Sequence, residues 1–384
     1  MTTPDHALAL YPEFAFLLAA TAWPHDDEAI VRIRAAAAGV TEIERLLALT
    51  RRHHVTGLVA RALAHCGDIL DSPARRELTL EALDLAEEQF RQLLQTHRAV
   101  GTLRERGIPV VVLKGVPAAL AIYGEAGVRR SVDIDLLVRR SDLEIARDTL
   151  EKTGYSRSDP PVDAGERQVR ASLRYGKDWG FDHHHSDTGI ELHWRLFQNP
   201  RLLGRIGMDD AVECTVAPGI ALPVVRPGIA ALYLVAHGAE HAWSRLKWLA
   251  DLAAVLRREP DAANRLMIGA MTHGIANMTM AALLLCHDLY ESPLPGQEYR
   301  AFASSWRTRR LVDIARASLI GEQDGTELEH RAMATTRKNL GHYLFSTDPR
   351  FWWRELAYDV FHEGRGGLAG LAQRAANVAR LQLS

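Results

Sequence analysis

Hydrophobic positions recur at helical spacing through the first hundred residues. Apolar stripes run along residues 46–63, and Asp71-Ser72-Pro73 has the character of a helix start. Residues 77–104 form a long amphipathic segment that ends at Gly107-Ile108-Pro109. The pattern therefore predicts an N-terminal helical region over residues 1–106.

The character of the chain changes after residue 107, where short β-branched runs alternate with shorter helical segments. Strands are expected at residues 110–113, around Asp133-Ile134-Asp135, and in a hairpin of residues 181–185 and 190–194. Helices are expected up to Tyr123 and over residues 142–153. This succession predicts a small mixed β-sheet core over residues 107–217.

Residues 218–227 are rich in proline and are expected to form a linker. Nearly everything after them has helical periodicity, which predicts a C-terminal helical domain over residues 218–384. The chain is thus expected to be of the α+β class, with a small sheet between large N- and C-terminal helical regions.

Asp133 and Asp135 are the most informative polar residues. They lie two positions apart in a run of aliphatic side chains, so both should point to one face of a strand while Ile134 points into the core. Like charges side by side on a half-buried strand are unfavourable unless cations neutralise them. The pair predicts a divalent-metal site, with Mg²⁺ or Mn²⁺ as the cofactor.

Metal-dependent nucleotidyl transfer commonly uses a third carboxylate on a neighbouring strand. Glu191 alternates with Ile190 and Leu192, so it should share one strand face with His193. Gly115 follows the first predicted strand and, lacking a Cβ, would let the backbone approach a nucleoside triphosphate. The adjacent Lys114 would add a positive charge for the phosphates.

Composition limits the partners. The formal net charge is -2, which argues against a protein that coats long nucleic acid electrostatically. Three widely spaced cysteines indicate neither a disulfide framework nor a cysteine-rich zinc site, and they fit a reducing cytoplasm. The apolar run at residues 14–23 is too short for a membrane span and is expected to be a core helix.

Several motifs together resemble an uncharacterised bacterial nucleotidyltransferase family of the DNA polymerase β-type superfamily. They are Leu113-Lys114-Gly115, Arg130-Ser131-x-Asp133-Ile134-Asp135-Leu136-Leu137-Val138, Glu191-Leu192-His193-Trp194 and the segment from His237 to Leu252. The resemblance extends over about residues 30–360. It implies the nucleotidyltransferase fold, metal binding by Asp133, Asp135 and Glu191, and a nucleoside triphosphate as co-substrate. It does not imply an acceptor.

The chain departs from the wider superfamily at one position. The usual glycine-serine or glycine-glycine pair is Gly115-Val116 here, so no hydroxyl follows the glycine. Lys114, Arg130 and Ser131 are therefore expected to contact the triphosphate, since a guanidinium fork suits phosphate oxygens.

One continuous helix is expected after the linker, with two stripes at four-residue spacing. The stripes are Trp243, Lys247 and Asp251, and His237, His241 and Arg245. Lys247 is expected to reach the triphosphate, positioned by Asp251, while the others and His193 are candidates for the acceptor side. The acceptor is a small molecule, a peptide or an RNA end, and no residue pattern chooses among these three.

Two other functions are compatible with parts of the sequence. His237-Gly-Ala-Glu240-His241 matches the H-x-x-E-H pattern of one class of zinc peptidases, with Glu322 as a possible third ligand. That interpretation leaves the carboxylates of the predicted strands unexplained. A non-catalytic scaffold that binds a nucleotide or a partner is the second alternative, and the intact set of three carboxylates argues against it.

Overall fold

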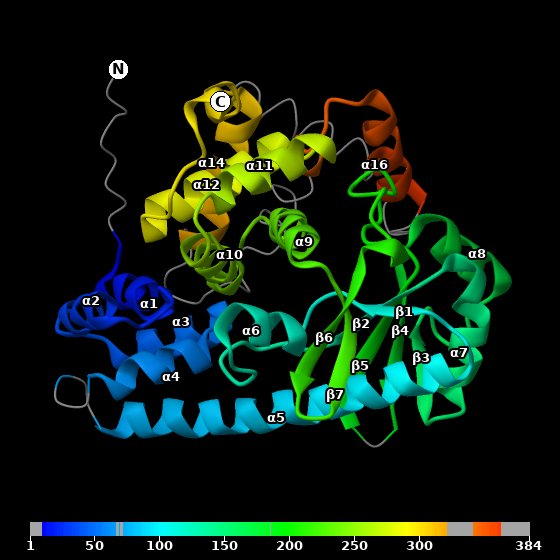
Figure 1. The fold of residues 1–384 in the computed structure, drawn as a ribbon, viewed down its shortest axis with the longest axis horizontal. Helices are drawn as coiled ribbons and strands as arrows, with labels where there is room; N and C mark the ends of the chain where they lie inside the picture. Colours follow the sequence, from blue (N-terminus) through cyan, green and yellow to red (C-terminus); the bar gives the residue numbers. More distant parts are fainter. Residues whose placement is uncertain (1–9, 67–68, 70–71, 185, 321–340, 362–384) are drawn as a thin grey trace.

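The computed structural model describes residues 10–66, 69, 72–184, 186–320 and 341–361. A seven-stranded mixed sheet carries helical regions before and after it in the chain (Figure 1). The predicted α+β class with helical flanks is thereby confirmed. Within the described part, no helix combines the length and the apolar character that a membrane span requires.

The N-terminal region consists of five helices, and the last of them is the longest. They are α1 (Pro12–Thr21), α2 (Asp27–Ala37), α3 (Ile43–His53), α4 (Thr56–Ala64) and α5 (Ser72–Glu105). Helix α5 runs along one side of the molecule beneath both the small helices and the sheet (Figure 1). Leu78 near its start packs into the core of the helical part, whereas Leu93 and Leu103 pack into the core beneath the sheet. Helix α5 therefore joins the two cores.

The sheet has the order β3-β4-β5-β2-β1-β7-β6. Its strands are β1 (Val110–Val112), β2 (Ile134–Val138), β3 (Tyr155–Asp159), β4 (Asp178–His183), β5 (Ser186–His193), β6 (Ala211–Ala217) and β7 (Ile220–Val225). Strand β2 runs parallel to β5 and antiparallel to β1, and β1 runs parallel to β7. The connecting elements are α6 (Val116–Tyr123), η1 (Arg140–Asp142), α7 (Leu143–Glu151), α8 (Glu166–Tyr175) and η2 (Met208–Asp210).

The two faces of the sheet pack against different helices because side chains alternate along each strand. Ile134 and Leu136 of β2 belong to a core shared with α5 and α7. Leu137 of the same strand and Val111 of β1 belong instead to the large core that contains the C-terminal helices. Asp135 has the same parity as Leu137, so it faces the C-terminal helices.

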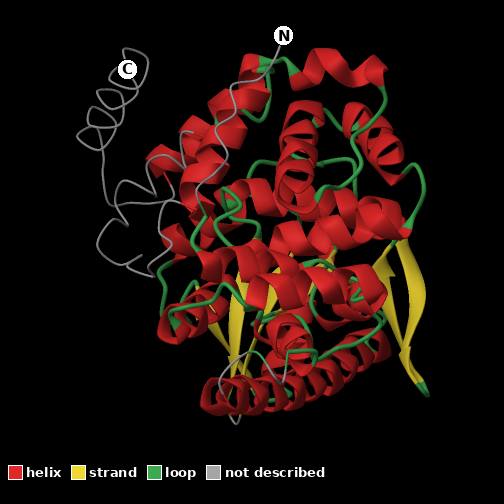
Figure 2. Cartoon of the chain, turned by 90° about the vertical axis from the view of Figure 1, so that its left-hand side faces the viewer, coloured by secondary structure: helices red, strands yellow, loops and turns green. Residues whose placement is uncertain are grey.

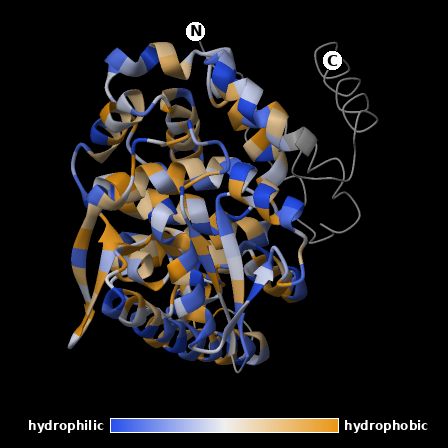
Figure 3. Ribbon diagram, turned by 90° about the vertical axis from the view of Figure 1, so that its right-hand side faces the viewer, coloured by the Kyte–Doolittle hydropathy of each residue, from blue (hydrophilic) through white to orange (hydrophobic). Residues whose placement is uncertain are grey.

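The C-terminal helices lie over that second face (Figures 1 and 2). They are α9 (Pro227–Glu240), α10 (Leu246–Arg258), α11 (Ala262–Thr272), α12 (Ala276–Tyr290), η3 (Gln297–Tyr299), α13 (Arg300–Ala303), α14 (Trp306–Ile320) and α16 (Pro349–Phe361). Hydrophobic residues concentrate in the strands and inner helices, while hydrophilic residues cover the outer ones (Figure 3).

Three local expectations were wrong. Residues 218–227 are not a linker: they form the turn after β6 and strand β7, which pairs with both β6 and β1. The turn of the β4–β5 hairpin lies near His184 and not at residues 186–189, because β5 already begins at Ser186. The helix expected through residues 237–251 is broken between α9 and α10, where Ala242 and Trp243 adopt positive φ angles of 50° and 52°.

Candidate active site

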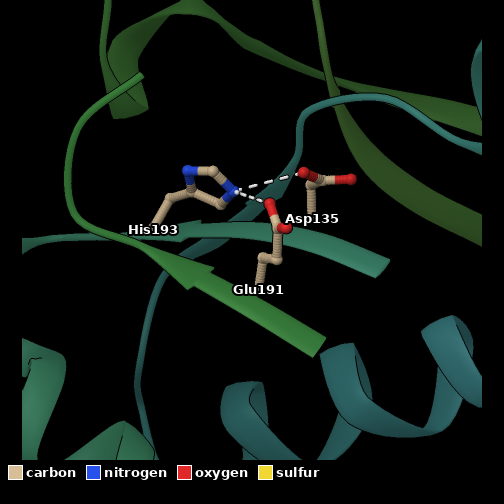
Figure 4. Close-up of side chains that lie close together, drawn as sticks. All are labelled: Asp135, Glu191 and His193. Carbon is tan, nitrogen blue, oxygen red and sulfur yellow. Dashed lines mark hydrogen bonds and ion pairs between the residues drawn. The ribbon is translucent and has the colours of Figure 1, made fainter. Parts of the chain in front are cut away.

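Two adjacent parallel strands bring three polar side chains together. Asp135 of β2 stands opposite Glu191 of β5 in the register of the sheet, and His193 follows two residues later on the same face of β5. The imidazole Nε2 of His193 lies 3.2 Å from Oδ1 of Asp135 and 3.2 Å from Oε2 of Glu191 (Figure 4). The sequence placed His193 on the acceptor side, whereas the structure places it between the carboxylates.

Two lysines neutralise this acidic cluster. The amine of Lys114, at the end of β1, lies 3.0 Å from Oδ1 of Asp135. Lys177 forms an ion pair with Asp178 at the start of β4, and its amine lies 3.5 Å from Oε2 of Glu191. Asp178 stands opposite His193 in the β4–β5 register, with 3.6 Å between its Oδ2 and the imidazole Nε2.

The cluster shifts the pKa values of its members in opposite directions. Burial disfavours the charged form of Glu191, but the hydrogen bond from His193 and the charge of Lys177 hold its pKa well below the usual range. Burial and Lys177 oppose protonation of His193, yet its hydrogen bonds to Asp135 and Glu191 outweigh them and raise its pKa. The site therefore holds Glu191 as an anion and favours a charged imidazolium beside it.

Asp133 lies just before β2 and is separate from this cluster of three. Its Oδ1 lies 3.6 Å from where a Cβ would stand on Gly189 of β5. Burial, together with the negative charges of Glu191 and Asp135, raises the pKa of Asp133. A cation at this place would relieve that repulsion.

Gly115 and Ser131 lie side by side next to Lys114. Gly115 has a φ of 92° and precedes the first turn of α6, and a Cβ on it would stand 3.4 Å from Oγ of Ser131. Because a positive φ of this size is unfavourable for other residues, glycine is required here. Ser131 is buried and its backbone is held by the side chain of Gln89, which both donates to its carbonyl and accepts from its N–H at 3.0 Å.

Of the two arginines before β2, Arg129 reaches the site and Arg130 does not. The side chain of Arg130 is 50% exposed and approaches Glu88 at 4.0 Å. Arg129 is buried, and its Nε donates to Oδ2 of Asp251 at 2.7 Å. The sequence assigned the triphosphate contact to Arg130, but of these two side chains it is that of Arg129 that lines the cleft described below.

The cluster forms part of a cleft of about 360 Å³ between the sheet and the C-terminal helices. The sheet side of its lining carries most of the charged groups, and the α9–α10 side contributes aromatic and histidine rings together with Glu240 and Lys247. Its lining residues are Lys114, Arg129, Ser131, Val132, Asp133, Asp135, Lys177, Glu191, Leu196, Gln198, Tyr233, His237, Glu240, His241, Lys247, Trp248 and His342.

Within the segment after β7, three expected site residues line the cleft and three do not. His237, His241 and Lys247 are lining residues. Trp243 is buried with its ring against Gly238, and Arg245 bonds to Arg52 and His54. Asp251 is buried and accepts hydrogen bonds from Arg129 and Tyr123. It was expected to position Lys247, but it positions Arg129 instead.

A comparison with protein families agrees with this arrangement. The model of a family described as an uncharacterised nucleotidyltransferase matches residues 40–291, from just before α3 to the end of α12. The chain belongs to this nucleotidyltransferase family. No curated protein and no solved structure matches it. The resemblance expected from the motifs is thereby confirmed.

The residues of this nucleotidyltransferase family member fit a divalent cation. Among the described residues, Asp135, Glu191 and His193 are the one group of three whose ligand atoms lie close enough for a common ion, all within 4.8 Å. Asp135 Oδ2 is buried and has no hydrogen-bond partner in the described part of the chain. A buried carboxylate oxygen without a partner is costly unless a cation or a donor reaches it.

The zinc-peptidase alternative gains no support from the geometry. His237 stacks on Tyr233 and His241 stacks on Trp248, and neither histidine belongs to the group that could share an ion. The third ligand proposed for that site, Glu322, lies outside the described residues.

Three residues that line or adjoin the cleft were missed from the sequence. Lys177 and Asp178 were missed because the β4 strand was expected to begin at residue 181. The alternation of buried Trp179 and Phe181 with Asp178 and Gly180 is the signal that could have located the true start. Trp248 carried no such signal.

Proposed function

We propose that the protein is a Mg²⁺- or Mn²⁺-dependent nucleotidyltransferase that moves a nucleoside monophosphate from a nucleoside triphosphate to an acceptor and releases pyrophosphate. The observation that carries this proposal is the Asp135–Glu191 pair on adjacent parallel strands, on the wall of a cleft that also carries several cationic side chains. Membership of the nucleotidyltransferase family supports the same reaction.

Asp135 and Glu191 would hold the metal, with Asp133 as the further ligand. His193 would join them as a ligand only as the neutral imidazole, after the imidazolium that the metal-free site favours has lost its proton. When bound, the metal polarises the α-phosphate and stabilises the charge of the departing pyrophosphate. Two carboxylates next to a cleft with cationic residues suit this chemistry, because Mg²⁺ commonly combines protein carboxylates with phosphate oxygens.

The cationic residues would receive the triphosphate. Lys114, Arg129 and Lys247 line the cleft on the side of Gly115 and Ser131, and the guanidinium of Arg129 suits phosphate oxygens. The backbone at Gly115 can approach phosphate closely because it carries no Cβ. Glu191 is 35% exposed, so its carboxylate can contact a metal and also accept a hydrogen bond from an acceptor hydroxyl. Because its lowered pKa makes it a weak base, its role toward that hydroxyl would be to orient it.

The acceptor would lie against the rings of α9 and α10. His237, His241 and Trp248 line this part of the cleft together with Tyr233. A cleft of about 360 Å³ suits a nucleotide with a small acceptor group, such as a small molecule or a side chain of a peptide. An RNA end remains the third class to test, while the net charge of -2 does not favour long nucleic acid.

The first test is thermal stabilisation of the purified chain by each of the four nucleoside triphosphates, with and without MgCl₂. We expect a magnesium-dependent rise in melting temperature with at least one nucleotide, because a ligand that binds the folded state stabilises it. Asp135→Asn should lose the rise, whereas Glu166→Gln on exposed α8 is the matched control and should keep it. The donor so identified is then incubated with hydroxyl-bearing small molecules, peptides and RNA, and products are detected by mass spectrometry.

Three outcomes would overturn the proposal. If no nucleotide stabilises the wild-type protein, the cleft is not a nucleotide site. Stabilisation by Zn²⁺ that His241→Ala abolishes would instead favour the peptidase. Stabilisation by a nucleotide without any nucleotidyl product across the acceptor panel, and without release of pyrophosphate, would favour the non-catalytic scaffold.

A further inference from the structure

The corner between α3 and α4 contacts the start of α10, where Lys247 lies. The backbone N–H of Leu246 donates to Nδ1 of His53 at 3.1 Å, and the guanidinium of Arg245 donates to the carbonyl of Arg52 at 2.7 Å. The first of these bonds satisfies a helix N–H that has no partner within its own helix. The N-terminal region therefore fixes the position of Lys247 in the cleft.

His54 lies at this corner between the side chains of Arg245 and Lys247. It caps α3 in the left-handed conformation with a φ of 56°, which directs its ring toward α10. Its Nε2 lies 2.6 Å from Nη1 of Arg245, and its Nδ1 lies 3.4 Å from Nζ of Lys247.

The contact with Arg245 determines which ring nitrogen of His54 carries the proton. A guanidinium can only donate, so Nε2 of His54 must be the acceptor. A neutral imidazole has one acceptor nitrogen, so Nδ1 then carries the hydrogen and faces the amine of Lys247. An ammonium group cannot accept a hydrogen bond, whereas a neutral amine can.

The other groups around Lys247 also disfavour an ammonium ion. Arg129 before β2 and Lys114 at the end of β1 contribute positive charge, as does Arg245 at the start of α10. Asp251, one turn along α10, is an anion, but Arg129 and Tyr123 engage its two oxygens. Arg130 offers only its backbone carbonyl, at 3.3 Å from the amine, and the Trp248 ring lies 5.8 Å away.

These surroundings are reflected in the titration of both side chains. Burial and the neighbouring cations lower the pKa of Lys247 from 10.5 to about 7. Burial, Lys247 and Arg245 lower the pKa of His54 to about 3, which keeps the imidazole neutral at any pH near 7.

We propose that burial, the cations around the amine and the His54–Arg245 pair hold Lys247 as a neutral amine above neutral pH in the nucleotide-free protein, and that Lys247 then takes up one proton from solvent when a triphosphate enters the cleft. This inference rests on the proposed function. His54 is a positioning residue, because it acts on the nucleotide through Lys247. The negative charge of the triphosphate stabilises the ammonium form, which then contacts phosphate oxygen.

The experiment is calorimetric titration of the full chain at pH 8 with a non-hydrolysable α,β-methylene analogue of the stabilising nucleotide and saturating MgCl₂. Repeating it in buffers of different ionisation enthalpy gives the number of protons bound with the nucleotide. We expect uptake close to one proton at pH 8. Above pH 7 the affinity should fall by up to about tenfold per pH unit, since protonation is linked to binding.

Two variants separate this mechanism from a structural effect. Lys247→Arg carries its charge at every pH, so binding should occur without proton uptake and with a flat pH dependence. His54→Asn suits the left-handed backbone but removes the ring N–H that faces the amine, so uptake at pH 8 should be smaller than in the wild type, although burial and Arg129 still disfavour the ammonium form. The melting temperature of each variant checks that it is folded.

The possible failures are distinguishable. Nucleotide binding by the wild-type protein without proton uptake at pH 8 would overturn this inference and leave the proposed function intact. The same proton uptake in Lys247→Arg as in the wild type would assign the proton to another group and also overturn it. Absence of binding with the analogue of every nucleotide would instead refute the proposed function.

Discussion

Glu191 is the residue whose carboxylate can contact both a metal and the acceptor hydroxyl. It faces Asp135 across the parallel strands, and its side chain is 35% exposed whereas that of Asp135 is fully buried. Lys177 and His193 hold it as an anion. The half-buried, anionic carboxylate of Glu191, beside the buried one of Asp135, can therefore contact a metal and also an acceptor hydroxyl.

We predict that Glu191→Gln lowers turnover about 100-fold, the size of effect seen when one electrostatic stabiliser of a transition state is lost. The nucleotide should still bind within about threefold of wild type, because Lys114 and Arg129 remain in place. Steady-state kinetics with the donor nucleotide measure both quantities. Equal losses in turnover and in nucleotide affinity would show that Glu191 mainly supports the binding site.

The lowered pKa of Lys247 also predicts how stability depends on pH. The unfolded chain holds this proton up to about pH 10.5 and the folded chain only up to about pH 7, so the unfolded state binds more protons between these values. The Lys247 contribution to stability therefore rises with pH in this window. Lys247→Met should be more stable than wild type at pH 7, and this advantage should shrink by about 2 kcal/mol by pH 9.

Urea unfolding at several pH values measures this difference, and Lys152→Met on the exposed end of α7 is the matched control. A gap between Lys247→Met and wild type that stays constant from pH 7 to pH 9 would contradict the prediction. It would mean that Lys247 keeps its proton in the folded protein.

The sequence identifies some of the site residues, but it does not show which residues they contact. Asp135 was recognisable because it pairs with Asp133 two positions earlier in an aliphatic run, and Glu191 because it alternates with Ile190 and Leu192. The position of His193 between them depends on the parallel pairing of β2 with β5, which brings His193 to Asp135 although the two residues are 58 positions apart. Lys177 became visible only once β4 was known to pair with β5.

At the scale of elements, the loop between α6 and β2 is held by two N-terminal helices. Helix α4 approaches it at Gly57, where a Cβ would stand 2.5 Å from the Cα of Val128. Helix α5 contributes Gln89, which binds both backbone groups of Ser131, and Gln92, which donates to the carbonyl of Val132 at 3.0 Å. These contacts position the residues that lead into the acidic strand.

We predict that Gln89→Leu destabilises the protein by about 2 kcal/mol, because it leaves the N–H and the carbonyl of Ser131 without their partner in a buried place. Nucleotide affinity should fall as well, since Arg129 and Ser131 lie in this loop. Chemical denaturation and calorimetry measure the two effects, with Glu87→Gln on the exposed face of α5 as the control. Unchanged stability and affinity would show that the loop keeps its place without α5.

Helical periodicity located most elements but not the break between α9 and α10. No proline marks it, and the stretch carries helix-forming residues on both sides. The chain turns there because the Trp243 ring packs against Gly238, where any Cβ would clash with the ring, and because His53 accepts the N–H of Leu246. The bond between Leu246 and His53 joins residues 193 positions apart, so no local pattern could predict it.

At the scale of the whole molecule, the cleft exists because the sheet unit and the C-terminal helices are held together beside it. Arg129 before β2 and Tyr123 at the end of α6 both donate to Asp251 on α10, at 2.7 Å and 2.8 Å. All three side chains are buried. Burial acts to lower the pKa of Arg129, but the negative charge of Asp251 outweighs this effect and raises it. The guanidinium that lines the cleft therefore remains charged.

We predict that Asp251→Asn destabilises the protein by about 3 kcal/mol or more, because it leaves a buried guanidinium without its counter-charge. The apolar triple variant Tyr123→Phe, Arg129→Met and Asp251→Leu should recover most of this loss, since well-packed apolar residues often replace a buried ion pair at little cost. Denaturant unfolding measures both. The triple variant should nevertheless bind nucleotide at least about tenfold more weakly than wild type, because Arg129 lines the cleft. Recovered stability together with wild-type affinity would mean that Arg129 only joins the two parts of the molecule, and that the triphosphate is held by Lys114 and Lys247 without it.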